Sequence, residues 1–566
     1  MRVLFVIPPY RTTDGLFADC FPMPLAPVLL GAILKQAGHE VHIEDFLLPM
    51  QKQIIAKPES FKGLRSPPYT HWGRPLEECE SWLEANISGY DVVCLALGQC
   101  NIWEGGAAIA KKVRELGKPL VVGGPLASTD PSFALKVTGA TVLVRGEADE
   151  VIAEVVERAV AMDKTGASGC IVEGTPPFNL NALPEPDWSL APPATYPRAC
   201  GGRVRGVLST SRGCPYRCSF CSVHAVHGRA HRRCDREHIK RQIINLANYG
   251  VEYFCFVDDN LFINEAKTDE VLAAIADARA VVGRAGKRWR FYVEEGVDVK
   301  IAAVPGLLAQ VAAAGFVNIA LGLETMNASR LEENRKPCEP EQLKAAAAEA
   351  RKAGIEVKAF YLVGFPGDTP ESVAFDLMAL SKLGFAIRVN NVKLYPGTDM
   401  TEQFKREGLI GKDYDWRKSS FHTPDSKDLK YKDVLALRSY LGAVGYAGAE
   451  LGLDVFAAKG DEIIGGLGAV AGMTVKDDWH ELTVSGNMYR PAPVARLAAL
   501  VMLRRFGGVK IRTIRGENLN TTITVTGQDE ALDRVQLALK KAMYGIEQPS
   551  LFEAPKPVPE FEGAPQ

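Results

Sequence analysis

The first 160 residues alternate short, continuously apolar segments with longer amphipathic ones. The amphipathic segments 25–38 and 107–117 repeat apolar residues at helical spacing. The apolar segments, which we interpret as strands, are residues 2–8, 40–46, 91–98, 119–124 and 141–147. Strands that are apolar throughout and separated by helices predict a parallel sheet covered on both faces. We therefore expect an α/β domain over residues 1–160, with a doubly wound, Rossmann-like sheet.

A second series of strands and helices begins at residue 201 and ends near residue 425. Each strand is followed by a helix-like segment, and the strands are expected at residues 204–211, 253–259, 289–296, 318–324, 357–365 and 388–396. Six such β/α units predict an open, partial TIM barrel with its site at the carboxyl ends of the strands. Residues 161–200, between the two series, are rich in proline, and we expect a linker that packs over a surface.

The pattern changes again after residue 425. Residues 426–545 predict a small α+β domain, with strands at 480–486, 509–516 and 521–527 and helices at 492–507 and 530–543. The tail, residues 546–566, is rich in proline and glutamate, and we expect it to be disordered. The role of the domain at 426–545 is left open: it could close the cavity, bind a peptide or mediate dimerisation.

Composition and charge limit the classes of function. The formal net charge of the 566 residues is −2, so no global basic field indicates a nucleic acid or an anionic membrane as partner. No stretch approaches ~18 uninterrupted apolar residues, and no transmembrane segment is expected. The N-terminus lacks the features of a signal peptide, which predicts a cytoplasmic protein. In that reducing compartment the twelve cysteines favour metal ligation or redox chemistry over structural disulfides.

Three cysteines gather directly after the strand at 204–211. Cys214, Cys218 and Cys221 have the spacing C-x3-C-x2-C. Three thiolates can ligate three irons of a 4Fe–4S cluster and leave the fourth iron open. Zinc would need a fourth ligand, for which the candidates are His224, His227, His231 and Cys234. The spacing is not that of a common zinc module, so the iron–sulfur interpretation is favoured over zinc, and both over a disulfide.

The cysteine motif, the strand before it and the six β/α units resemble the radical S-adenosylmethionine (radical SAM) enzymes. The resemblance covers roughly residues 200–425. It implies that the open iron chelates the amino and carboxylate groups of the methionine moiety. Reductive cleavage would then yield a 5′-deoxyadenosyl radical, with electrons from an external donor of the flavodoxin or ferredoxin kind.

The same resemblance implies contacts with S-adenosylmethionine (SAM) at the ends of the barrel strands. Phe220 is expected against the adenine, with Gly364, Phe365 and Pro366 along it. Contacts with the methionine amine or the ribose are expected from Asp258, Asp259, Asn260, Glu294 or Glu295, and Glu324. For each acid, a solvated strand end or a helix N-cap is the alternative. Cys234, Cys255 and Cys338 are expected to be core or surface thiols.

The N-terminal segments, together with the glycine turn Gly123–Gly124, resemble the cobalamin-binding domain often fused ahead of a radical SAM core. A glycine pair lets the backbone approach a large ligand closely, although an ordinary turn would explain it as well. The loop at residues 8–24 lacks the Asp-x-His-x-x-Gly motif whose histidine ligates cobalt, and His39 and His42 lie at the second strand. The resemblance therefore implies base-off cobalamin without a histidine ligand. Candidates for its lower face are Gln99, Asn101 and Trp103, which could instead cap the following helix.

This architecture implies a cobalamin-dependent radical SAM methyltransferase. One SAM would methylate the cobalamin, and a second would supply the radical that activates an unactivated carbon to take the methyl group from methylcobalamin. The alternatives are a cyclase or oxidase without methyl transfer, and a cobalamin or iron–sulfur binding protein without turnover. The substrate, a small molecule or a peptide, is not identified. Tyr361, Tyr395 and His422 are candidate proton donors or bases by location alone.

Overall fold

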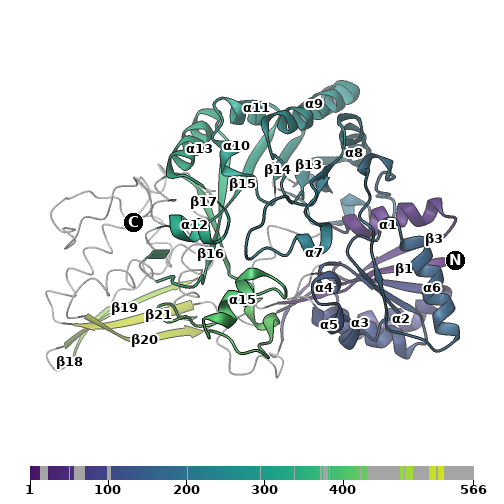
Figure 1. Cartoon of the computed structure of the whole chain (residues 1–566), viewed down its shortest axis with the longest axis horizontal. Coiled ribbons are helices and arrows are strands. Elements are labelled where there is room, and N and C mark those ends of the chain that lie inside the picture. The colour runs from purple at the N-terminus through teal and green to yellow at the C-terminus, as the bar shows by residue number, and fades with distance from the viewer. Residues whose placement is uncertain are drawn as a thin grey trace.

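The computed structural model describes most of the chain up to residue 430 and four strands beyond it. The described residues are 1–12, 23–49, 51–55, 70–98, 103–199, 202–293, 295–336, 338–369, 372–373, 376, 380, 383–420, 423–430, 472–476, 479–487, 509–517 and 520–527. Two parallel sheets, each with its own helices, form the larger part of them (Figure 1).

The N-terminal sheet has six parallel strands in the order β3-β1-β6-β7-β8-β9. These are β1 (Arg2–Ile7), β3 (Glu40–Asp45), β6 (Val92–Ala96), β7 (Leu120–Gly123), β8 (Val142–Arg145) and β9 (Cys170–Glu173). The direction in which the sheet grows reverses between β1 and β6, as it does in doubly wound sheets. Ligands of such sheets bind at the carboxyl ends of the strands beside this reversal.

Helices cover both faces of this sheet, which explains why its inner strands β1, β6, β7 and β8 are largely apolar, whereas the edge strands β3 and β9 are mixed and only partly buried. On one face Val3 and Phe5 pack with α1 (Leu25–Gln36) and α6 (Ile152–Lys164). On the other face Leu4 and Val6 pack with α2 (Leu76–Asn86), α3 (Trp103–Glu115) and α5 (Pro131–Thr138). The boundary expected at residue 160 falls within α6, and β9 lies beyond it, so the sheet extends to residue 173.

The proline-rich segment after β9 is a packed layer between the two sheets. Trp188 and Tyr196 are buried in a core shared with α1 and with the second sheet. Lys35 of α1 lies 2.5 Å from an oxygen of Asp187, and Asn245 donates a hydrogen bond of 2.8 Å to the carbonyl of Pro186. The segment therefore contacts both domains, and between residues 174 and 199 its only helical parts are two short 3-10 turns at Leu180–Ala182 and Pro193–Thr195.

The second sheet is the predicted partial barrel. Its six parallel strands follow one another in chain order: β10 (Val204–Leu208), β13 (Val251–Phe256), β14 (Arg290–Val293), β15 (Phe316–Glu324), β16 (Glu356–Val363) and β17 (Ala386–Asn391). The longer helices beside them are α8 (Arg236–Asn248), α9 (Glu265–Val282), α11 (Leu307–Ala313), α13 (Pro340–Ala353) and, after the last strand, α15 (Asp399–Arg406). Each of the six strands overlaps the range expected for it from the sequence, with ends that differ by a few residues.

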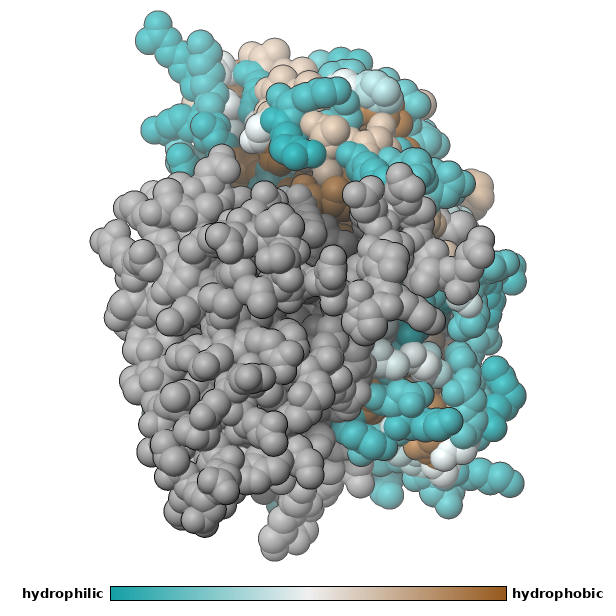
Figure 2. Space-filling model, turned by 90° about the vertical axis from the view of Figure 1, so that its left-hand side faces the viewer, coloured by the Kyte–Doolittle hydropathy of each residue, from teal (hydrophilic) through white to brown (hydrophobic). Residues whose placement is uncertain are grey.

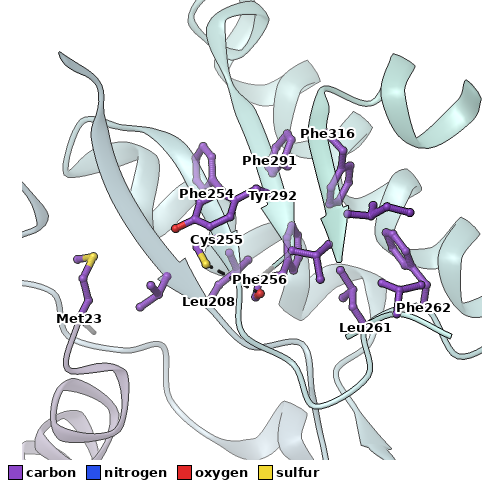
Figure 3. Packing of buried hydrophobic residues seen from close by; sticks show 14 of the residues in the cluster. Met23, Leu208, Phe254, Cys255, Phe256, Leu261, Phe262, Phe291, Tyr292 and Phe316 are labelled. Atoms are coloured by element: carbon purple, nitrogen blue, oxygen red, sulfur yellow. Dashed lines mark hydrogen bonds between the residues drawn. The ribbon is translucent and has the colours of Figure 1, made fainter. Parts of the chain in front are cut away.

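Aromatic packing fixes the middle of the barrel. The rings of Phe254, Phe291 and Phe316 stand side by side on neighbouring strands, with centroids 5.1 and 5.4 Å apart (Figure 3). Phe256 stacks on Phe316 at 5.5 Å. Such pairs add to the stabilisation that burial of the rings provides. The strand ends that carry the candidate site thus extend from a rigid base.

Three smaller sheets complete the described residues, one of which is the two-stranded pair of β11 (Ser211–Arg212) and β12 (Arg232–Arg233) beside the barrel. Near the C-terminus, β18 (Gly472–Lys476), β19 (Trp479–Asn487), β20 (Val509–Glu517) and β21 (Asn520–Gly527) form an antiparallel sheet in the order β18-β19-β21-β20. β18 was not expected from the sequence; the helices expected at 492–507 and 530–543, and the tail 546–566, lie outside the described residues. The third sheet, β2 (Tyr10–Thr12), β5 (Thr70–Trp72) and β4 (Lys52–Ile54), was also not expected.

Figure 2 views the molecule from the side on which the C-terminal strands lie, and most of the residues that it colours are hydrophilic, with hydrophobic ones between them. Among the helices within the described ranges, none combines the length and the hydrophobicity needed to cross a bilayer.

Candidate cofactor-binding site

The cysteine loop, residues 213–231, leaves the barrel directly after β10. Its base is closed by two short antiparallel strands, β11 (Ser211–Arg212) and β12 (Arg232–Arg233). Gly213 has a φ of 83°, and a Cβ there would lie 2.3 Å from the carbonyl oxygen of Ala230, so only glycine fits. Its amide donates a hydrogen bond of 2.9 Å to Asp259. The loop is thus fixed at its start to the carboxyl end of β13.

Cys214, Cys218 and Cys221 are free, partly buried thiols in this loop. Burial raises the pKa of all three, to about 12 for Cys221, where the neighbouring Cys218 and Cys214 act in the same direction. Thiols of this kind become ligands when a metal displaces their protons. Within the described ranges no three His, Cys, Asp or Glu side chains converge on a single point. The thiolates of a 4Fe–4S cluster bind separate irons and need no such convergence.

A lysine and a glutamate that face each other accompany the cysteines. Lys336 Nζ lies 3.1 Å from Glu324 Oε1 and 6.0 Å from the centroid of the Phe220 ring. A Cβ on Gly322 would lie 2.7 Å from Nζ, so the glycine makes room for the ammonium group. Burial alone would lower the pKa of Lys336, but Glu324 and Cys218 raise it, and the group stays charged. Lys336 was missed by sequence reasoning, because nothing in "NRKPC" sets it apart from a surface lysine.

Glu324 itself stands in an uncommon backbone conformation. Its φ is 73°, in the left-handed region that residues other than glycine rarely adopt. It is the last residue of β15, and the conformation turns its carboxylate toward Lys336. Strain of this kind is held where the surrounding structure enforces it, often at functional sites.

The three polar residues after β13, Asp258 to Asn260, make different contacts. Asp258 is completely buried, and its Oδ1 accepts hydrogen bonds from the Thr210 amide (2.9 Å), the Thr210 hydroxyl (2.8 Å) and the Ser211 hydroxyl (2.6 Å). Burial raises its pKa to about 6. This geometry favours a role in positioning the start of the cysteine loop over the methionine contact that was expected. Asp259 holds Gly213, and the buried Asn260 keeps an Oδ1 without a hydrogen-bond partner.

The turn after β16 is held by a buried carboxylate. Asp368 Oδ2 accepts hydrogen bonds from the amides of Gly364 (2.8 Å) and Phe365 (3.0 Å), and Arg330 pairs with its other oxygen at 2.5 Å. Gly364 has a φ of 105°. The Phe365 side chain is buried and meets the ring of Phe220 edge-on at 6.0 Å. Phe220 and this turn, both expected at the adenine, are therefore neighbours in space.

Other residues singled out from the sequence are placed elsewhere or lie outside the described residues. Glu294, Gln99, Asn101 and His422 belong to the latter group. Tyr361 is buried and donates a hydrogen bond of 2.7 Å to Asp376, and burial raises its pKa well above the usual value, so it is not placed as a proton donor. Trp103 packs edge-on against Phe133 of α5 at 5.1 Å. Cys234 and Cys255 are buried, as expected.

A cavity of about 340 Å³ lies at the carboxyl ends of β6, β7 and β8 of the N-terminal sheet. Its walls are largely apolar and include Phe5, Cys94, Val121 and Val144, with residues of the linker, of β11 and of α8 opposite. A Cβ on Gly123 would meet nothing within 4 Å, so this glycine leaves cavity space open. The cavity is in the size range of small-molecule sites and lies where doubly wound sheets bind ligands.

Two histidines, His227 and His238, border this cavity, and each has its Nδ1 3.0 Å from a protein side chain, Glu147 and Arg241 respectively. Three others belong to the N-terminal domain but not to the cavity wall. His39 contacts the N-terminal amine. His42, in the middle of β3, contacts the Tyr90 hydroxyl. His71, on β5 beside the first loop, was missed by sequence reasoning. It is buried, with Nε2 2.9 Å from the carbonyl of Arg74 and Nδ1 3.4 Å from Arg11 Nε, so both ring nitrogens have partners.

The carboxyl ends of the two sheets face each other. The short helix α4 (Pro125–Thr129), which follows β7, lies next to α7 (His224–His227) of the cysteine loop (Figure 1). Farther along, Trp416 Nε1 donates a hydrogen bond of 2.8 Å to Asp130, and the guanidinium of Arg417 lies 3.6 Å from the Phe133 ring centroid. The cavity of the N-terminal sheet and the cysteine loop of the barrel therefore border one interdomain region.

Residues 208–377 match the family model described as the Radical SAM superfamily. The chain therefore carries a radical SAM domain, and the resemblance inferred from the cysteine motif is confirmed. Three similar proteins are named methyltransferases. They are an uncharacterised methyltransferase of Pyrococcus horikoshii (26% identical, covering 57% of this chain and 70% of the relative), the hopanoid C-2 methylase of Rhodopseudomonas palustris (26%, 59% and 61%) and the bacteriochlorophyllide d C-8(2)-methyltransferase of Chlorobaculum tepidum (25%, 59% and 73%).

Solved structures show the same fold. One is the radical SAM methyltransferase TsrM from Kitasatospora setae with cobalamin and a 4Fe–4S cluster bound, with a TM-score of 0.53 and 18% identity over 73% of this chain and 75% of that one. Another is the cobalamin-dependent radical SAM enzyme OxsB with aqua-cobalamin and SAM bound, with a TM-score of 0.56 and 12% identity over 82% and 68%. At these identities the likeness establishes the fold alone.

Proposed function

We propose that this chain is a cobalamin-dependent radical SAM methyltransferase that transfers a methyl group from SAM to an unactivated carbon of a small molecule or peptide. One observation carries the proposal. The cysteine loop at the mouth of the barrel faces an apolar cavity at the carboxyl edge of a second parallel sheet. A 4Fe–4S cluster and a large organic cofactor would thus border one interdomain region.

The residues at the barrel mouth fit a 4Fe–4S cluster and SAM. Cys214, Cys218 and Cys221 would hold three irons, and the cluster would supply the electron that cleaves SAM. Lys336 is placed to attract the methionine carboxylate and to offset the charge of the thiolates. The unpartnered buried oxygen of Asn260 suits the methionine amine. Phe220 and the backbone at Gly364 suit the adenine.

The cavity of the N-terminal sheet fits part of a cobalamin. Its apolar walls and the open space at Gly123 suit the aromatic base and nucleotide tail of a base-off cobalamin. Cobalamin would supply a carrier for the methyl group. The lower face would lack a histidine ligand, because the first loop lacks the cobalt-ligating motif and because His39, His42 and His71 have other partners. Of the two histidines that border the cavity, His227 has its Nδ1 3.0 Å from Glu147, and His238 has its Nδ1 3.0 Å from Arg241. Gln99 and Asn101 remain candidates for that face.

The protein's own contribution would be placement and exclusion of water. The ion pairs and ring contacts between the domains hold the two carboxyl edges together, so that a substrate between them would meet both cofactors. All cysteines among the described residues are free thiols, which supports work in a reducing compartment such as the cytoplasm, with an external flavodoxin-like or ferredoxin-like donor.

The test needs no substrate. The full chain is purified anaerobically, reconstituted with iron and sulfide, and incubated with cobalamin, SAM and a reductant, and mass spectrometry then measures methylcobalamin and 5′-deoxyadenosine. We expect both products. Deoxyadenosine without methylcobalamin would indicate a cyclase or oxidase, and zinc without iron at Cys214, Cys218 and Cys221 would overturn the proposal.

A further inference from the structure

A buried network of charges connects the N-terminal sheet to the base of the cysteine loop. Glu147 and Asp149 follow β8, and their side chains are only 2% and 6% exposed. Asp149 binds Arg212 with both oxygens, at 2.8 and 3.0 Å. Glu147 accepts hydrogen bonds from Arg212 at 2.8 Å and from Arg232 at 3.1 Å, and lies 3.0 Å from His227 Nδ1.

The two arginines are the residues that close the loop. Arg212 and Arg232 are paired across the β11–β12 ladder, which is two residue pairs long, and Gly213 begins the loop directly after Arg212. A ladder of this length is not stable by itself. Charge-assisted, bidentate pairs with arginine fix both distance and orientation. The carboxylates of the other domain therefore supply the constraint that the short ladder lacks.

The same residues form part of the wall of the apolar cavity. Glu147, Asp149, Arg212 and His227 all border it, as does Asp259, which holds the amide of Gly213. A ligand in the cavity would limit the motion of this wall. The wall in turn holds the cysteine loop, so the two sites share one set of side chains.

We propose that Glu147 and Asp149 are positioning residues that clamp the cysteine loop, and that through them occupancy of the cavity and order in the loop stabilise each other. The coupling is reciprocal. If a ligand in the cavity favours the ordered loop by some factor, then the ordered loop binds that ligand more tightly than the open loop does, by the same factor. The clamp stands on the contacts alone, whereas the coupling to a corrinoid rests on the proposed function.

Hydrogen exchange of the anaerobic, cluster-reconstituted full chain tests the clamp. In Glu147→Gln we expect exchange of residues 213–231 to be about tenfold faster than in the wild type, because the loop opens locally, with α9 unchanged. Asp149→Asn, which keeps the Arg212–Glu147 pair, should show a smaller effect and serves if the first variant does not fold. The control is Glu173→Gln, which removes an exposed partner of Arg145 on the neighbouring strand. Equal exchange of the loop in the wild type and both clamp variants would overturn the proposal.

Addition of hydroxocobalamin tests the coupling. In the wild type it should slow the exchange of residues 213–231 by roughly threefold or more, and in Glu147→Gln it should not. Binding that is visible by absorbance but leaves loop exchange unchanged in the wild type would overturn the coupling. If hydroxocobalamin does not bind the wild type at all, the proposed function fails, and the comparison without cofactor still decides the clamp.

Discussion

The two parallel sheets present different chemistry at the same edge. The barrel strands follow one another in chain order and end in charged and sulfur-bearing groups: Asp259, Glu324 and the cysteine loop, with Lys336 among them. The N-terminal sheet reverses its order and ends in glycines and a largely apolar cavity, and the two carboxylates there, Glu147 and Asp149, are paired with Arg212. The first edge suits an anionic cluster and the zwitterionic end of SAM, and the second suits a bulky, largely neutral ring system. Strand order and the residues at the strand ends, rather than parallel pairing itself, decide which ligand each edge takes.

The largest effect should separate the two edges. Cys218→Ala removes one of three thiolates and should lower the iron content after reconstitution from about four to roughly none per chain. The cobalamin should still bind, although more weakly if the loop and the cavity are coupled as proposed, because most of the apolar wall of its cavity comes from the other sheet. Iron and sulfide assays beside cobalamin absorbance measure both. Cys170→Ala, at a partly exposed thiol on β9, is the control and should keep the iron; loss of cobalamin together with iron in Cys218→Ala would contradict the separation.

The converse variant fills the cavity. Gly123→Leu should weaken cobalamin binding on the order of 100-fold, because its side chain enters space that the cofactor needs. The fold should tolerate it, since a Cβ at this position meets nothing within 4 Å. Titration of hydroxocobalamin, followed by absorbance, measures the affinity, and the iron content should not change. Gly411→Leu is the matched control, because a Cβ there also meets nothing within 4 Å but lies outside the cavity.

The sites of these two variants differ in how far the sequence predicted them. The strands of both sheets and the cysteine motif are local patterns, and Cys214, Cys218 and Cys221 could be named from spacing alone. The glycine at position 123 was recognisable as part of a turn, but the sequence could not show that open space lies beside it.

Residues that act over long separations were not predictable in this way. Lys336 meets Glu324 only because the chain folds back after α12 (Ala328–Glu333), and the Arg212–Glu147 contact joins two domains. Asp258 carried the right signal, an acid at a strand end, but its side chain turns into the protein and binds Thr210 and Ser211. Periodicity predicts which face of a strand or helix is buried, but it does not predict which distant residue each side chain contacts.

A smaller effect should test the charge at the barrel edge. Lys336→Met keeps the length of the side chain and removes the ammonium group, and SAM affinity should fall by roughly 10- to 100-fold, the range for a lost hydrogen bond to a charged group. Calorimetry with the cluster-loaded protein measures it. Lys352→Met, at an exposed lysine paired with Glu349, is the control. Unchanged SAM affinity in Lys336→Met would place the carboxylate elsewhere.

The smallest effect should come from the glycine beside that lysine. Gly322→Ala puts a Cβ 2.7 Å from Lys336 Nζ, and the flexible lysine end must move by a few tenths of an ångström or more. SAM affinity should fall by about three- to tenfold, less than in Lys336→Met, because the charge is displaced and not removed. The double variant should be no weaker than Lys336→Met alone. An additive loss would mean that Gly322 acts on SAM independently of the lysine.

The central claim is that one chain holds two different cofactors at its two parallel sheets. The most direct test measures iron, sulfide and cobalamin on the same anaerobically reconstituted chain, together with the electron paramagnetic resonance spectrum of bound cob(II)alamin. The account predicts about four irons and about one cobalamin per chain, with no nitrogen superhyperfine splitting, because no histidine ligates the cobalt. Iron without cobalamin, or a spectrum split by a nitrogen ligand from the protein, would contradict it.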